Sequence, residues 1–254
     1  MDRTSLSNRP VVHKPARPPF QIDAGVYSEP CGDSACALFA PMHYEPGYAY
    51  PLIVWLHGPG GEERQLLRVM PLVSMRNYVA VGPRATFRDE DQAETACIHR
   101  WRQTEQHISL AENRVFESIE LACSKYNVNA GRIFLAGFGC GGTMALRIAL
   151  AHPHRFRGVI SLGGPLPTGG TPLSSLTEAR RVPVLLAAGQ HSTTFCPELV
   201  CGNLRLLHTA GMSITLRQYP CGQELSPQML ADVDRWIIDQ ITNPRPDRTR
   251  SDAE

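Results

Sequence analysis

The chain has 254 residues, of which 43% are hydrophobic and 19% are charged, so it holds enough apolar material for one large domain with a buried core. Its formal net charge of +1 provides no overall field that would draw it to nucleic acid. No apolar run approaches the roughly 20 residues that cross a bilayer, and residues 1–20 lack the continuous apolar segment of a secretory signal. These properties predict a cytoplasmic protein with no transmembrane segment and no nucleic-acid partner.

The two ends of the chain differ in composition from its middle. Residues 1–22 are rich in Pro, and the first twenty carry four basic residues against one acidic residue. Because neither these residues nor 243–254 can bury enough apolar surface to offset chain entropy, we predict two disordered tails around one domain at 23–242. A basic tail can dock to an acidic partner, although a solvated end is the more common meaning of such a segment.

Between the tails, short apolar runs alternate with longer segments of helical periodicity. Buried strands are predicted at 51–57, 78–82, 132–137, 158–163, 182–189 and 214–219. Helices are predicted at 62–75, 108–126, 141–151, 197–210 and 227–241. The repeated strand-helix order implies an α/β fold, with a mainly parallel, twisted sheet and helices on both faces. Residues 27–41, broken by a turn at 30–33, predict an antiparallel hairpin at the sheet edge.

A glycine-rich stretch at 137–142, GFGCGG, lies between the predicted strand at 132–137 and the helix that follows it. At such strand-to-helix turns many hydrolases carry the motif G-x-S-x-G, in which a sharp turn exposes the nucleophilic serine. Here the serine is missing. The stretch is not a phosphate loop either, because no Lys-Ser or Lys-Thr pair follows it.

Three separated segments resemble the phospholipase/carboxylesterase branch of the α/β-hydrolases, which includes acyl-protein thioesterase-like enzymes. They are LIVWLHGPGG at 52–61, the stretch from RIFLAGFGCGG to SLGG at 132–164, and YPCGQELSP at 219–227. The resemblance covers roughly residues 26–241. It implies an α/β-hydrolase fold, and the sequence contains no evident insertion for a large cap domain. The resemblance implies no cofactor, and no metal-ligand spacing of His and Cys is present.

The resemblance also assigns positions to a Ser-Asp-His triad, and none of the three carries the required residue. The nucleophile position is Gly139, the acid position is Ser192, and the histidine position is Gln223. Glycine has no side chain that could attack, serine supplies no negative charge, and glutamine takes up no proton at neutral pH. We therefore predict a degenerate catalytic triad and a chain that is inactive by the family's serine mechanism.

The predicted oxyanion hole is altered as well. In many relatives one donor is the backbone N–H of the residue after His-Gly, which here is Pro59, followed by Gly60. Proline has no N–H, so only the N–H of Cys140 remains from the usual pair. Loss of one such donor costs about 2.7 to 4 kcal/mol of transition-state stabilisation.

Two residues beside these positions allow a rearranged site to be considered. Cys140 could act as a nucleophile, and His191, next to the acid position, could act as its base. Against this, Cys140 lies one place too late in the turn, which would put Phe138 where a small residue is needed. The simpler interpretation is that Cys140 fills the place of the usual oxyanion-side residue and His191 is a loop histidine.

The sequence therefore supports two hypotheses of different classes. The first is an esterase-like pseudoenzyme that binds a protein partner or a small acyl or ester-like ligand. The second is an active ester or thioester hydrolase with a rearranged site that uses Cys140.

Overall fold

The computed structural model describes residues 27–31, 34–89, 98–169 and 176–243. The tails predicted at 1–22 and 243–254 lie outside the described residues, apart from residue 243. The elements predicted within the domain are all present. The largest boundary differences are an earlier start of the third predicted strand, at Val128, an earlier start of the second predicted helix, at Glu105, and a later start of the first predicted helix, at Gln65.

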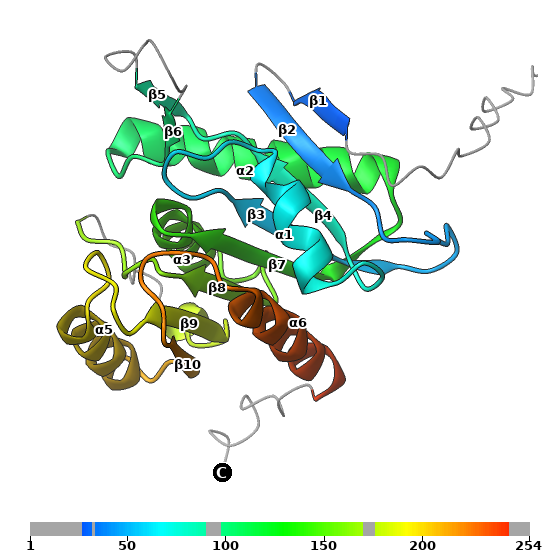
Figure 1. The fold of residues 1–254 in the computed structure, drawn as a ribbon. Coiled ribbons are helices and arrows are strands. Elements are labelled where there is room, and N and C mark those ends of the chain that lie inside the picture. The colour runs from blue at the N-terminus through cyan, green and yellow to red at the C-terminus, as the bar shows by residue number, and fades with distance from the viewer. Residues whose placement is uncertain (1–26, 32–33, 90–97, 170–175, 244–254) are drawn as a thin grey trace, which may run out of the picture.

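The centre of the molecule is an eight-stranded sheet with the order β1-β2-β4-β3-β7-β8-β9-β10 (Figure 1). Its strands are β1 (Tyr27–Cys31), β2 (Ser34–Phe39), β3 (Tyr50–Leu56), β4 (Val79–Pro83), β7 (Val128–Phe138), β8 (Gly158–Leu162), β9 (Val184–Gly189) and β10 (Ile214–Tyr219). Strands β4, β3, β7, β8, β9 and β10 run parallel to their neighbours among themselves, whereas β1 and β2 pair antiparallel. This confirms the predicted parallel sheet with an antiparallel hairpin at its edge.

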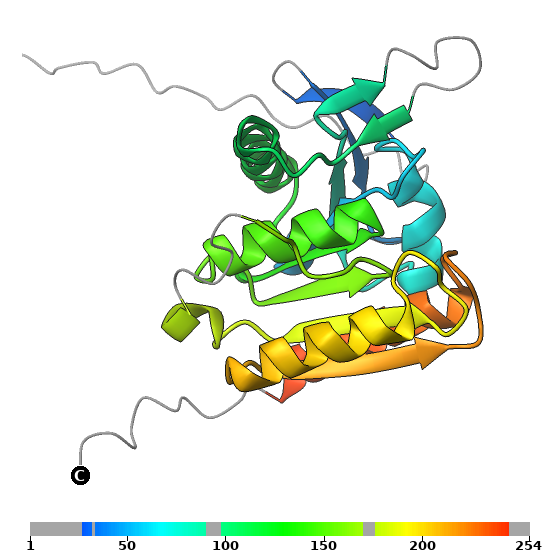
Figure 2. The same cartoon turned by 90° about the vertical axis from the view of Figure 1, so that its left-hand side faces the viewer.

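Helices cover both faces of this sheet. They are α1 (Gln65–Val73), α2 (Glu105–Lys125), α3 (Cys140–Ala151), α4 (Leu176–Ala179), α5 (Pro197–Thr209) and α6 (Pro227–Thr242). Figures 1 and 2 show α1 and α6 together on one side, with α2 and α3 on the other. A separate two-stranded hairpin, β5 (Phe87–Asp89) and β6 (Ile98–Arg100), lies outside the main sheet. In the described part of the chain, no helix is long and apolar enough to cross a membrane.

Strand β3 shows why helices pack on both faces of the sheet. Its side chains alternate between two hydrophobic cores, with Leu52, Val54 and Leu56 facing the core under α2 and α3, and Ile53 and Trp55 facing the core under α1 and α6. A strand that is buried on both faces is read in the sequence as a continuous apolar run, as in PLIVWL.

The loops that follow the parallel strands all leave the sheet at one edge, where α/β proteins place their sites. The turn between β7 and α3 is the tightest of them. A Cβ atom added to Gly141 would lie 2.2 Å from the carbonyl oxygen of Leu56, and one added to Gly142 would lie 2.5 Å from Ser161 Oγ. Helix α3 therefore begins in direct backbone contact with the end of β3, and only glycine allows this approach.

Two helical glycines provide a matched test of this packing. Gly141→Ala should destabilise the protein by about 3 kcal/mol or prevent folding, because the new methyl group meets backbone atoms that cannot move aside. Gly202→Ala on α5 should raise stability by about 0.5 to 1 kcal/mol, because its Cβ would enter open space within a helix. Thermal and denaturant unfolding measure both changes; equal effects would contradict the packing described for Gly141.

Candidate functional site

The turn between β7 and α3 places Gly139 at its apex. Gly139 has φ 54° and ψ −121°, a conformation that residues with a side chain rarely adopt. Its N–H donates to the carbonyl of Leu162 at 2.8 Å, and its carbonyl accepts from the N–H of Thr143 at 3.0 Å. The backbone therefore keeps the sharp turn that presents a nucleophile in hydrolases, with glycine in the position that points outward.

The direction of a side chain at the apex follows from the same geometry. A Cβ atom added to Gly139 would lie 2.9 Å from Pro59 Cδ and 3.9 Å from Gln223 Nε2. It would thus point between the loop after β3 and the loop after β10. These are the two loops in which the sequence placed the oxyanion donor and the histidine.

The predicted acid and histidine positions also meet in the structure. The Ser192 hydroxyl donates to Gln223 Oε1, and Gln223 Nε2 donates to the carbonyl of Gly163 at 2.8 Å. The backbone N–H of Phe195 donates to Ser192 Oγ at 3.0 Å. Because a carbonyl only accepts, the Gly163 contact fixes the amide orientation of Gln223, and its oxygen then faces Ser192.

This chain of hydrogen bonds carries no charge. The Ser192 side chain is buried, and its single proton is committed to Gln223. Gln223 offers neither a basic nitrogen nor an acidic group. The structure thus brings together Gly139, Ser192 and Gln223, with no nucleophile and no titratable group among them. The assignment of these positions to a former triad stays a prediction.

The loop after β3 uses its backbone donors internally. The N–H of Gly58 donates to Gln65 Oε1 at 3.0 Å, and the N–H of Gly61 donates to the carbonyl of Gly58 at 3.1 Å. Pro59 has no N–H, and its ring faces the apex of the turn at Gly139. Gly60 follows in an exposed position at φ 71°.

Cys140 is the first residue of α3 and lies one place beyond the apex. Its side chain is partly buried and packs against the core that includes Trp101 and Met144. This burial raises the pKa of the Cys140 thiol, despite backbone N–H groups near the sulfur that favour the thiolate. A raised pKa lowers the fraction of nucleophilic thiolate at neutral pH.

His191 lies beside Ser192, as the sequence requires, in an exposed position. Its backbone N–H donates to the carbonyl of Cys221 at 3.0 Å, which joins the loop after β9 to the loop after β10. Its exposure and this backbone contact are those of a loop residue.

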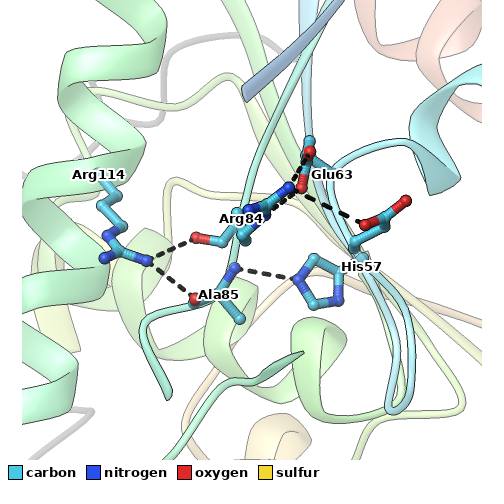
Figure 3. Close-up of polar contacts among 6 residues, drawn as sticks. His57, Glu63, Arg84, Ala85 and Arg114 are labelled. Carbon is cyan, nitrogen blue, oxygen red and sulfur yellow. Dashed lines mark hydrogen bonds and ion pairs between the residues drawn. The ribbon is translucent and has the colours of Figure 1, made fainter. Parts of the chain in front are cut away.

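A buried histidine supports the loop that carries Pro59 (Figure 3). His57 is fully buried, and the N–H of Ala85 donates to its Nε2 at 3.0 Å. Nδ1 then carries the proton and donates to the carbonyl of Gly58 at 2.9 Å. Trp101 Nε1 donates to the carbonyl of His57 at 3.1 Å. Both ring nitrogens of His57 are thus engaged in holding the loop.

An ion pair anchors the other end of the same loop. The Glu63 carboxylate accepts two hydrogen bonds of 2.6 Å from Arg84, and Arg114 of α2 donates to the carbonyls of Arg84 and Ala85 (Figure 3). Burial alone would raise the pKa of Glu63, but the hydrogen bonds and charge of Arg84 bring that pKa below its ordinary value. The network joins the loop, the end of β4 and α2.

The buried imidazole makes the stability of the fold depend on pH. Burial lowers the pKa of His57 from 6.5 to about 4. Between pH 6.5 and pH 4 the imidazole is protonated in the unfolded chain but neutral in the folded chain. The contribution of His57 to the free energy of unfolding is therefore complete above about pH 6.5 and falls as the pH drops toward 4. Between pH 7 and 5 this contribution should be about 2 kcal/mol.

Denaturant unfolding from pH 7 to 5 measures this dependence, above the range in which Glu63 titrates. His57→Gln should flatten the slope relative to the native chain. The imidazole resonances of His57 in the native chain provide a second readout that does not depend on the variant. Titration of that ring with a midpoint near 6.5 would contradict the account.

Sequence reasoning missed several residues that shape this site. They are Gly163, Gln65, Glu63 and Arg84, which act through a backbone carbonyl, a side-chain amide and an ion pair. Only the glycine pair at 163–164, at the end of a predicted strand, gave a visible signal. Among the described residues, no group of three or more His, Cys, Asp or Glu side chains could hold a metal ion.

The sheet topology and the sharp turn between β7 and α3 are those of an α/β-hydrolase. The family model for phospholipase/carboxylesterase proteins matches residues 47–241, so the chain belongs to this family. A probable carboxylesterase of Oryza sativa subsp. japonica is 30% identical over 111 residues, and a probable SOBER1-like carboxylesterase of Arabidopsis thaliana is 26% identical over 112 residues. Each match covers 43% of this chain, and 42% and 43% of those proteins, respectively. The chain thus spans less than half the length of these curated relatives.

Solved structures agree on the fold. A carboxylesterase from Mesorhizobium loti superposes with a TM-score of 0.68 at 18% identity, covering 84% of this chain and 98% of its own. SOBER1 of Arabidopsis thaliana superposes with a TM-score of 0.63 at 21% identity, covering 76% of this chain and 100% of its own. Acyl-protein thioesterase 2 of Zea mays superposes with a TM-score of 0.62 at 19% identity, covering 81% of this chain and 98% of its own.

Proposed function

We propose that this protein is a non-catalytic member of the phospholipase/carboxylesterase family that binds a protein partner or a small acyl or ester-like ligand. The observation that carries the proposal is the uncharged set of Gly139, Ser192 and Gln223, arranged around one turn. A serine hydrolase needs a hydroxyl, an imidazole and a carboxylate at such a place. Here each of the three positions holds a residue that cannot fill its role.

The substituted residues form a satisfied arrangement of their own. The Ser192 hydroxyl and the Gln223 amide bond to one another, and Gln223 bonds onward to Gly163. These contacts connect the loops after β8, β9 and β10 without a charge. Because these buried and partly buried polar groups have partners, the site has a defined shape, which is consistent with binding.

Pro59 is a second obstacle to catalysis, and it does not depend on the triad positions. It removes a backbone donor, and its ring lies within 2.9 Å of the point where a Cβ on Gly139 would be. We infer that Pro59 fills the space where a nucleophile and an oxyanion would meet. Residual turnover should then fall below the level that an intact oxyanion hole alone provides.

The ligand classes follow from the family. Relatives of this chain carry the names carboxylesterase and acyl-protein thioesterase, which denote esters and thioesters as substrates. An acyl or ester-like compound that is held without being cleaved is therefore one candidate, and a protein that contacts the loops around Gly139 is the other.

The alternative of an active hydrolase with Cys140 as nucleophile has less support. Burial raises the pKa of Cys140, and the residue at the apex with the outward direction is Gly139. The ring nitrogens of His57 are occupied by Gly58 and Ala85. No specific observation favours the rearranged site.

A stepwise reconstruction tests the proposal. Hydrolysis of short aryl esters is compared for the native chain, for the triple variant Gly139→Ser/Ser192→Asp/Gln223→His, and for the same variant with Pro59→Leu. The triple variant should remain near background, because Pro59 crowds the new serine and supplies no N–H. The fourth substitution should then raise the rate by about 100-fold or more, the usual contribution of one oxyanion donor.

Two comparisons make the result decisive. Pro59→Leu alone should stay at background, since it restores a donor without a nucleophile. Unfolding curves should accompany each variant, because a side chain at the positive φ of residue 139 costs about 1 to 3 kcal/mol. Equal rates for the triple and quadruple variants would refute the role given to Pro59, and native turnover abolished by one substitution would refute the non-catalytic proposal.

A further inference from the structure

Four tyrosines form an aromatic cluster at the end of the sheet opposite the candidate site. Tyr44 stacks on Tyr50 with ring centroids 5.3 Å apart and meets Tyr126 edge to face at the same distance. Tyr48 meets Tyr50 edge to face at 4.7 Å. Tyr50 begins β3 and Tyr126 follows α2, so the loop at 40–49 brings the other two rings against them. We call these four residues the tyrosine cluster.

The tyrosine cluster contains one ring that is buried and one that is accessible to solvent. Tyr50 is 6% exposed, whereas Tyr48 is 50% exposed. Hydrogen bonds hold the loop in place, because the N–H of Glu45 donates to the Tyr50 hydroxyl at 3.1 Å and Asn127 Nδ2 donates to the carbonyl of Pro46 at 2.9 Å. Because the loop is already held in place, a ligand that binds these rings orders few additional side chains, and the entropic cost of binding is small.

The chain enters the described fold close to this cluster. Strand register aligns Tyr27 with Leu38, Leu38 with Val81, and Val81 with Val54 in one row across the sheet. Tyr50 lies four residues nearer the amino end of β3 than Val54. Three strand spacings and four residues along the strand amount to a separation of about 20 Å between Tyr27 and Tyr50.

The sequence before Tyr27 has the composition that aromatic surfaces recognise. Residues 14–19 read KPARPP, which contains a P-x-x-P pattern and two basic residues. Such segments favour the polyproline II helix and dock on grooves lined with aromatic rings. Eight residue steps separate Pro19 from Tyr27, and at 3.1 Å per residue they allow a reach of about 25 Å, more than the separation of about 20 Å from the tyrosine cluster.

We propose that residues 14–19 dock on the tyrosine cluster of the same chain, with prolines packed on the exposed face of Tyr48 and a basic side chain directed to Glu45. A tether of this length gives an effective concentration near the millimolar range, so even a weak intrinsic affinity is sufficient. Glu45 is exposed within the loop and supplies the opposite charge. This inference does not depend on the proposed function.

Protection of the tail from protease tests the docking in the full-length chain. Chymotrypsin cleavage after Phe20, followed by mass spectrometry, should accelerate about tenfold in Tyr48→Ala, as expected for a Kd near 0.1 mM at millimolar effective concentration. Leu206→Ala is the matched control, because Leu206 is similarly exposed at 53% but lies on α5. The cleaved sequence is identical in all three proteins. Equal cleavage in native chain and Tyr48→Ala, with both folded, would overturn the proposal.

A second measurement identifies the occupant of the cluster. In the native chain, amide resonances of Tyr48 and Glu45 should differ from those of the double variant Pro15→Ser/Pro18→Ser, and the difference should not change with protein concentration. Glu45→Gln should make the cleavage rate after Phe20 less sensitive to salt. Identical resonances, or a difference that vanishes on dilution and therefore arises from a second copy, would each contradict docking within one chain.

Discussion

The contact between α3 and the end of β3 is the constraint on which the site depends. Gly141 lies so close to the carbonyl of Leu56 that any side chain would collide with it. This approach forces the sharp turn at Gly139, and the turn sets the direction in which residue 139 faces Pro59 and Gln223. The turn is therefore held by packing between helix and strand, independently of any chemistry at its apex. Glycine at the apex is compatible with this packing.

The loops around the turn are stabilised by two different means. On one side, His57 and the ion pair of Glu63 with Arg84 fix the loop that carries Pro59, and all three are buried or partly buried polar groups with defined partners. On the other side, the neutral hydrogen bond of Ser192 to Gln223 joins the loop after β9 to the loop after β10. The first network ties stability to pH through burial of an imidazole, whereas the second does not titrate.

Most of the fold and part of the candidate site could be predicted from the sequence, on different grounds. The strands and helices follow from apolar periodicity, because each parallel strand is buried on two faces and each helix on one. Gly139, Ser192 and Gln223 were placed by family resemblance, which supplies positions without contacts. The hydrogen bond to Gly163, the amide of Gln65 and the approach of Pro59 to the apex depend on loop conformation. No periodic pattern encodes a loop, so these features emerged only with the three-dimensional arrangement.

The central claim is that no side chain of this protein acts as a nucleophile in the family's manner. Intact-protein mass spectrometry after incubation with a fluorophosphonate probe tests it most directly, with an active serine esterase treated in parallel. We predict that the mass of the native chain stays unchanged while the esterase gains one adduct, because residue 139 has no hydroxyl and a Cβ there would face Pro59 and the amide of Gln223. A single stoichiometric adduct on the native chain, mapped to one residue near the turn, would contradict the account.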